Sequence, residues 1–206
     1  MDPALELADY RRRVVRLYLA EPRTGRAGVD DFRRRRDALF RDHAQSALTD
    51  AQRSGFRGLA YFSYDPKAVV RTRVEAPSGG GRLEIDTGGE DGVIRYRRVG
   101  VLAVPWGSLT LYWMEGYGGG LFLPFSDSTA GEETYGAGRY LVDTAKGTLG
   151  RGLELDVESG EAVLDFNYAY NPSCAYHSRW ACPLAPPENR LGEPIRAGEL
   201  AYPSAV

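Results

Sequence analysis

The chain has 206 residues, of which 43% are apolar, 11% aromatic and 26% charged, and its formal net charge is −2. Such values exclude wholesale disorder and fit a single globular unit. The weak net charge argues against a nucleic-acid partner. No apolar run approaches the roughly 20 residues of a membrane helix, so no membrane span is expected.

The N-terminus and the cysteine content bear on the compartment. Residues 1–10 are acidic and lack an apolar segment, so they do not resemble a secretory signal. Two cysteines are too few for a disulfide-rich scaffold. We therefore expect a cytoplasmic protein in which Cys174 and Cys182 are reduced.

The first predicted helix spans residues 3–20. Leu7, Tyr10, Val14 and Tyr18 recur there at helical spacing, which is typical of an amphipathic helix that packs on a core. The Glu-Pro pair that follows ends the helix, and a glycine-rich loop is expected up to residue 28.

The second predicted helix spans residues 30–42, with Asp30 as its N-cap. One face of this helix carries Phe32, Arg36, Leu39, Phe40 and His43. The run Arg33–Arg36 places four successive side chains about 100° apart, so we interpret it as solvated surface and not as one basic patch. Residues 44–54 are polar and are expected to form a connection without regular structure.

From residue 55 onward the pattern becomes that of short strands separated by Gly and Pro. Strands are predicted over residues 68–75, 82–86, 93–104, 109–114, 121–123, 139–143, 153–157 and 162–167. Turns are expected between them, including one at residues 88–92. Because no strand–helix alternation occurs, the sequence predicts a mainly β fold, an antiparallel β-sandwich or barrel with two N-terminal α-helices.

The last forty residues are expected to be irregular because six prolines lie between positions 172 and 203. Tyr, Trp, Cys and Leu in this stretch predict an ordered wrap against the barrel. We therefore divide the chain into a helical N-terminal arm, residues 1–53, and a β-domain, residues 54–206. The wrap begins at residue 170, and the parts together form one globular unit.

The segment around Asp165 is the most informative for function. On a continuous strand, Asp165 and Asn167 would share one face with Val163, while the opposite face is apolar. One interpretation is a structural ion pair between Asp165 and Arg139, held beneath the wrap.

The other interpretation is a polar pocket at one end of the barrel, rimmed by tyrosines that include Tyr135. Its candidate ligand-binding residues are Arg139, Tyr140, Asp165, Asn167, Tyr170, Asn171, Tyr176, Glu188 and Asn189. Were it an enzyme, Asp165 or Glu188 would be the candidate catalytic base, because an aromatic pocket raises the pKa of a carboxyl group.

Two hypotheses on function follow from these residues. The first is a binder of, or enzyme acting on, a small molecule, for which no cofactor is indicated. The second is a non-catalytic structural or interaction protein that forms a homodimer through its helical arm. An empty pocket would favour the first, and a filled barrel with all of these polar groups paired would favour the second.

The two cysteines leave several alternatives open. Cys174, His177 and Cys182 could supply three metal ligands, but they lack the paired CxxC spacing. A nucleophilic thiol or a disulfide that pins the wrap are further alternatives. The leading interpretation is that both thiols are buried and pack as small apolar groups, and no metal site is predicted.

Several motifs together are similar to one family. They are Phe56–Phe62 with Tyr64–Pro66, Leu121–Phe125, Glu133–Tyr140, Asp165–Pro172, Cys174–Tyr176, Cys182–Pro183, Pro186–Leu191 and Ile195–Glu199. Over residues 36–199 the chain resembles the bacterial and archaeal domain-of-unknown-function family 1684. The resemblance implies a soluble prokaryotic protein and transfers no catalytic residues, since the family has no established activity. Ser63 stands where the family pattern has proline.

Overall fold

The computed structural model describes residues 2–21, 24–79, 81–86 and 92–203. Three helices precede the strands: α1 (Pro3–Leu19), α2 (Gly25–Asp42) and the short α3 (Asp50–Ser54). Most of the turn expected at residues 88–92 lies outside the described residues. Among the described helices, none has the length and apolar character needed to cross a membrane.

The helices differ from the prediction in two places. Helix α2 begins at Gly25, five residues before the predicted Asp30, and the added residues include the buried Gly28 and the fully inaccessible Val29. Packing of that turn outweighs the low helix propensity of its glycines. Helix α3 was not predicted, although Thr49 and Gln52 form a capping box, a signature visible in the sequence.

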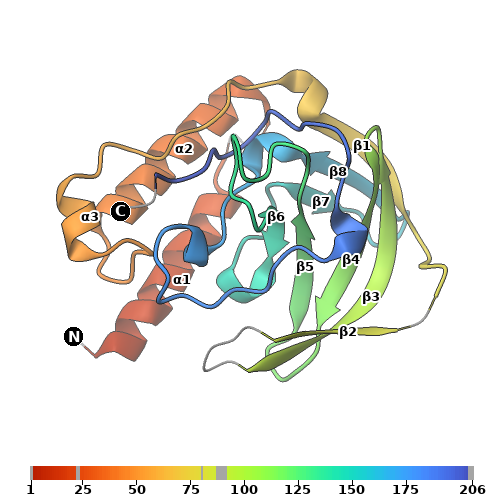
Figure 1. Cartoon of the computed structure of the whole chain (residues 1–206), viewed down its shortest axis with the longest axis horizontal. Helices are drawn as coiled ribbons and strands as arrows, with labels where there is room; N and C mark the ends of the chain where they lie inside the picture. Colours follow the sequence, from red (N-terminus) through yellow and green to blue (C-terminus); the bar gives the residue numbers. More distant parts are fainter. Residues whose placement is uncertain (1, 22–23, 80, 87–91, 204–206) are drawn as a thin grey trace.

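The strands were predicted to within two residues at each end. They are β1 (Val69–Glu75), β2 (Arg82–Asp86), β3 (Val93–Val104), β4 (Gly107–Met114), β5 (Gly120–Phe125), β6 (Arg139–Asp143), β7 (Leu153–Leu155) and β8 (Glu161–Asp165). All pairings are antiparallel, in the order β6-β5-β4-β3-β1-β8-β7, with β2 paired to β3. The sheet curls into a nearly closed barrel, which confirms the predicted fold class (Figure 1).

Strand β8 is shorter than predicted, and this changes the geometry around Asp165. The strand ends at Asp165, and Phe166–Tyr168 form a 3-10 turn. Asn167 therefore does not continue the strand face that holds Asp165, as the alternation had suggested.

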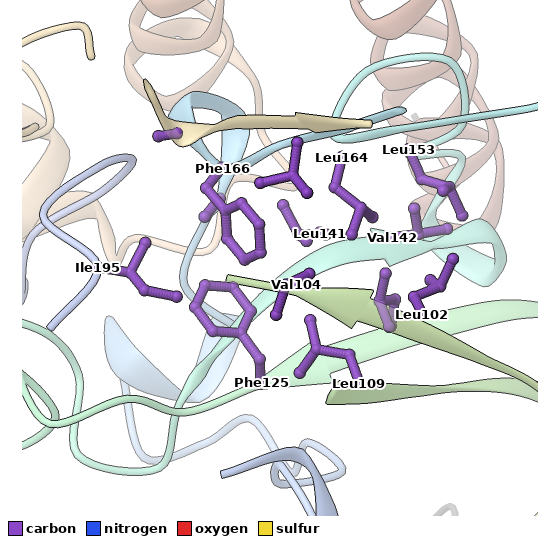
Figure 2. Close-up of a cluster of buried hydrophobic side chains, with 14 of the residues drawn as sticks. Leu102, Val104, Leu109, Phe125, Leu141, Val142, Leu153, Leu164, Phe166 and Ile195 are labelled. Atoms are coloured by element: carbon purple, nitrogen blue, oxygen red, sulfur yellow. The ribbon is translucent and has the colours of Figure 1, made fainter. Parts of the chain in front are cut away.

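The barrel interior is filled by aliphatic and aromatic side chains (Figure 2). Leu102, Leu109, Phe125, Leu164 and Phe166 are among its fully inaccessible members. These side chains come from β3, β4, β5 and β8 and from the turn after β8. Among the described residues, these side chains fill the interior and leave no room there for a ligand.

A second apolar layer lies on the outer face of the sheet, where α1 and α2 cover it (Figure 1). Tyr18 of α1 meets Phe32 of α2 edge to face at 5.1 Å between ring centroids, and Phe32 meets Tyr168 at 5.0 Å. Tyr18 also contacts Tyr170, with ring centroids 6.2 Å apart. Val14, Leu17 and Tyr18 of α1 and Val29, Phe32 and Leu39 of α2 are thus buried within the same chain, whereas Leu5, Leu7, Val15 and Leu19 of α1 remain exposed.

The described part of the wrap, residues 170–203, is irregular but ordered, as predicted, with 3-10 turns at Ser173–Ala175 and Pro187–Asn189. Asn189 is fully inaccessible and joins two strands to the wrap. Its Oδ1 accepts from the Thr110 amide at 2.8 Å, and its Nδ2 donates to the Pro124 carbonyl at 2.7 Å.

Gly152 permits the close approach that nearly closes the barrel. It has φ +74°, and a Cβ atom there would lie 2.6 Å from the backbone oxygen of Leu141 in β6. Gly152→Ala is expected to lower the free energy of unfolding by about 2 kcal/mol or more, from the left-handed backbone and the backbone clash together. Urea denaturation measures this loss.

Gly192→Ala is the control, because a Cβ at Gly192 would meet nothing within 4 Å. It should change stability by less than about 0.5 kcal/mol. Equal losses for the two variants would show that the approach of Gly152 to β6 does not matter for stability.

Candidate functional site

Arg139 anchors the wrap and does not pair with Asp165, so the predicted ion pair is wrong. Its Nη2 lies 2.7 Å from Oδ2 of Asp127, and both side chains are only 1% exposed. The same guanidinium donates to the carbonyls of Ile195 and Ala197 in the wrap. Asp165 lies on β8, which is separated from β6 in the strand order, so the two residues are not on neighbouring strands.

Tyr176 and Asn171 belong to a buried ionic cluster around Arg36. Nη1 of Arg36 lies 2.9 Å from Oε2 of Glu199, and Nη2 donates to the Tyr176 hydroxyl at 3.0 Å. The Tyr61 hydroxyl accepts from the same guanidinium, and Glu199 also accepts from the Asn171 amide. Arg36 is thus buried and paired, in contrast to the solvated surface expected for residues 33–36.

A small cavity of about 70 Å³ borders this cluster, between α1, α2 and the wrap. Its lining includes Tyr18, Tyr170 and Lys146. Ligand sites usually have about 300 Å³ or more, so this space suits a few water molecules better than a substrate.

Glu188 forms an ion pair at the surface. Arg98 donates to both of its carboxylate oxygens, at 2.7 and 2.9 Å, and the Tyr112 hydroxyl donates at 2.5 Å. The Arg98 hydrogen bonds lower the pKa of Glu188. Glu188 therefore lacks the raised pKa that we had expected of a catalytic base.

Tyr140 and Tyr170 lie within the aromatic layer and do not rim an open pocket. Tyr140 is fully inaccessible, and its hydroxyl donates to the Pro183 carbonyl. The Tyr170 hydroxyl lies 2.9 Å from Oγ1 of Thr148. Tyr135, expected at the same rim, instead donates to the sulfur of Cys174 at 3.6 Å.

Asp165 lies in a cleft of about 360 Å³ on the outside of the barrel. The floor is formed by the outward residues of β1, β8 and β7, among them Val69, Arg71 and Glu154. The walls are Tyr64, Tyr168 and the start of α2. The cleft is thus on the sheet's outer face, whereas the sequence had suggested the barrel end.

The Asp165 carboxylate is held on one side and open on the other. Its Oδ1 accepts from the backbone amide and from Nδ2 of Asn167, at 2.9 and 2.8 Å. Two hydrogen bonds to the backbone of Asp65 fix Asn167. Its Oδ1 accepts from the Asp65 amide, and its Nδ2 donates to the Asp65 carbonyl. Among the described residues, the hydrogen bonds to this carboxylate come from Asn167 and reach Oδ1, and no arginine forms an ion pair with it.

Burial raises the pKa of Asp165, and the hydrogen bonds from Asn167 only partly oppose this effect. A carboxyl group with a raised pKa and a free oxygen in a cleft is typical of a functional site. Asn167 acts here as a positioning residue. Asp165 and Asn167 were both predicted as site residues from the sequence, whereas their neighbours Glu154 and Arg71 in the cleft were not.

Tyr168 is fixed at the cleft wall by a buried arginine. Nη1 of Arg151 donates to the Tyr168 hydroxyl at 2.8 Å, and its carbon Cζ lies 5.1 Å from the centroid of the tyrosine ring. Arg151 also donates to the carbonyls of Ala20 and Gly28, which ties the ends of α1 and α2 to the cleft.

The cysteines are free thiols in the structure. Within the described part of the chain, no group of three or more His, Cys, Asp and Glu side chains is arranged to hold a metal ion. His177 accepts a hydrogen bond at Nδ1 from the Arg179 amide.

Asp127→Ala is expected to destabilise the fold by about 3–5 kcal/mol, because it leaves the buried Arg139 guanidinium without its counter-charge. Urea denaturation gives the loss. The control is Glu133→Ala, which breaks the exposed pair with Arg196 and should cost less than about 1 kcal/mol. Similar losses in both variants would mean that Arg139 is not the anchor of the wrap.

The comparisons with known proteins agree with the fold. A family model described as "Protein of unknown function (DUF1684)" matches residues 54–200. The chain is similar to an uncharacterized protein of Haloarcula marismortui solved in solution by NMR, at 32% identity and TM-score 0.56, over 84% of this chain and 92% of that one. No curated protein matches the chain. The chain therefore belongs to the DUF1684 family.

Proposed function

We propose that the chain binds a small polar molecule in the Asp165 cleft, with Oδ2 of Asp165 as the principal acceptor. The observation that supports this most directly is the half-satisfied carboxylate. Asn167 fixes its Oδ1, and among the described residues the hydrogen bonds to this carboxylate reach only that oxygen. Oδ2 is not among the fully buried polar atoms that lack a partner, and Asp165 lines the cleft, so this oxygen is accessible to a ligand or to water.

The size and lining of the cleft support a small ligand with two kinds of polar group. Its volume of about 360 Å³ is within the range of small-molecule sites. Asp165 and Glu154 can accept hydrogen bonds, while Arg71 can donate them. The ligand we propose therefore carries an amine or hydroxyl donor and, a few atoms away, an acceptor such as a carboxylate or phosphate.

Asp165 would also serve as a general base if the bound molecule reacts. A general base works best when its pKa is close to neutral, and burial shifts the pKa of Asp165 in that direction. Its fixed Oδ1 would leave Oδ2 as the atom that receives the proton. We carry over no reaction class from the family.

The second candidate, a structural protein that dimerises through residues 1–53, has less support. The filled barrel and the internal pairing of Arg139 and Asn189 do favour structural roles for those residues. However, the apolar faces of α1 and α2, with Val14 and Phe32, are already buried against the barrel. A dimer through the helical arm would have to use the apolar side chains of α1 that stay exposed, which are Leu5, Leu7, Val15 and Leu19.

Binding can be tested by NMR on isotope-labelled protein with amino acids, amino alcohols and their phosphate esters as probes. At least one probe class should shift backbone amides around the cleft, such as those of Gly152 and Asp165. Asp165→Asn should weaken that binding at least tenfold, because it removes the charge that attracts the donor. Glu158→Gln, an exposed acid in the turn before β8, is the control and should change nothing.

Probe-induced shifts that persist unchanged in Asp165→Asn would contradict the proposal. Shifts confined to residues remote from the cleft would do the same. Native mass spectrometry of the purified protein adds an independent readout, because a co-purified small molecule should be lost in the same variant.

Asp165 should also make stability depend on pH. Because its pKa is raised in the folded state, the folded protein binds this proton more tightly than the unfolded chain. The stabilisation is complete below the ordinary value of 3.8 and is lost as pH rises through the raised pKa. At pH 7 the charged carboxylate therefore opposes folding.

Asp165→Asn removes that charge but keeps an acceptor for Asn167. Its melting temperature should equal or exceed that of the wild type at pH 7, and the gain should vanish near pH 3.8 and below. Thermal melts from pH 3 to pH 8 measure this. A variant that is markedly less stable at pH 7 would instead assign Asp165 a structural role.

A further inference from the structure

We infer that Cys174 and Cys182 form a redox-active pair that a hydroperoxide converts into an intramolecular disulfide, with Cys182 as the attacking thiolate. The proposal concerns the C-terminal wrap and is independent of the Asp165 cleft. It assigns chemistry to the two thiols, for which sequence analysis had left several alternatives open.

The wrap brings the two cysteines into direct contact. The Cys174 backbone amide donates to the sulfur of Cys182 at 3.4 Å, and the Cys174 thiol also hydrogen-bonds to that sulfur. On its other side, Cys174 accepts from the Tyr135 hydroxyl at 3.6 Å. Both thiols are free, so a disulfide can form without displacing another ligand.

The surroundings distinguish the two sulfurs. The hydrogen bond from the Cys174 thiol, the positive charge of Lys146 and the backbone amides of Cys174 and Ser173 lower the pKa of Cys182 to about 6, although burial opposes them. The pKa of Cys174 is raised, chiefly because its thiol donates to Cys182. At neutral pH Cys182 is thus the thiolate, and thiolates are the nucleophiles in this chemistry.

Burial restricts the oxidant to a small molecule. Cys182 is only 6% exposed, whereas Cys174 is partly exposed. A hydroperoxide can reach such a sulfur more easily than a bulky disulfide can. We therefore name hydrogen peroxide or a small organic hydroperoxide as the oxidant.

The Cys182 thiolate attacks the terminal peroxide oxygen, an S–O bond forms, the O–O bond breaks, and the leaving hydroxide or alkoxide takes a proton from solvent. The Cys174 thiol then loses its proton and attacks the Cys182 sulfenic acid, so that an S–S bond forms and water leaves. Two thiols are oxidised to one disulfide, and one peroxide is reduced to water, or to water and an alcohol.

The disulfide would close the loop that holds the wrap to the segment before α3. Within this loop, Trp180 donates to the Ala47 carbonyl at 3.0 Å, and the Tyr176 carbonyl accepts from Gln52 at 2.8 Å. Closing the loop removes freedom from the unfolded chain and should raise the melting temperature of the oxidised protein. Oxidation would thereby fasten the wrap to the helical part of the chain.

The test treats the reduced full-length protein with one equivalent of hydrogen peroxide at pH 7. Intact-mass spectrometry should show the loss of two hydrogens, and peptide mapping should show Cys174 linked to Cys182. The same protein unfolded in urea is the control, and its disulfide should form at least tenfold more slowly because the lowered pKa is lost. Oxidation without the cross-link, or an equal rate in urea, would overturn the proposal.

Single variants test the assignment of roles. Cys174→Ser should trap Cys182 as a sulfenic acid that dimedone labels, whereas Cys182→Ser should react at least tenfold more slowly. Equal labelling of the two variants would overturn the assigned roles. Circular dichroism shows whether each variant is folded. If a variant is unfolded, the rates of disulfide formation in folded and urea-unfolded wild-type protein still test the proposal.

Discussion

The buried guanidinium of Arg139 is the constraint on which the position of the wrap depends. A charge that is 1% exposed must be neutralised and hydrogen-bonded, and Asp127 together with the carbonyls of Ile195 and Ala197 does this. One partner comes from the loop after β5 and the others from the wrap. Because these partners lie far apart in sequence, a single buried charge fixes the path of the wrap over the barrel.

The helices are joined to the barrel through the same segment of the wrap. Glu199, two residues after Ala197, forms the ion pair with Arg36 of α2 and accepts from the Tyr176 hydroxyl. The backbone of Leu200 pairs with that of Ala60, which leads from α3 to β1. The wrap therefore joins α2, the segment before β1 and the barrel into one structure. A substitution of Arg139 that displaces the wrap should also disturb the ion pair of Arg36 with Glu199.

Asp165 differs from these paired charges. Arg139 and Arg36 each have a carboxylate partner and are fully engaged, as a stable buried charge requires. Asp165 is less deeply buried, at 9% exposed, and among the described residues the hydrogen bonds to its carboxylate come from Asn167 and reach one oxygen. This contrast within one chain supports a structural role for the arginines and a binding role for Asp165. The cysteine pair is a third kind of site, in which two thiols contact each other through hydrogen bonds but are not joined by a disulfide.

The sequence by itself determined the secondary structure of the β-domain, its antiparallel fold class and the irregular wrap, whereas it left open whether the barrel is filled. Alternation of apolar residues is a local signal with a period of two, so strands such as Arg82–Asp86 and Val93–Val104 were predicted with their observed bounds. The same local signal placed Arg36 on the apolar face of α2. The capping box of Thr49 and Gln52 was also visible but was not used.

Only the tertiary structure decided which charges meet. The partner of Arg139 was predicted to be Asp165, yet strand order separates β6 from β8 and brings Asp127 to Arg139 instead. The early start of α2 depended on the burial of Val29, and the end of β8 at Asp165 depended on Asn167 reaching the backbone of Asp65. Each of these outcomes rests on contacts between residues far apart in sequence, and a local pattern contains no information about such contacts.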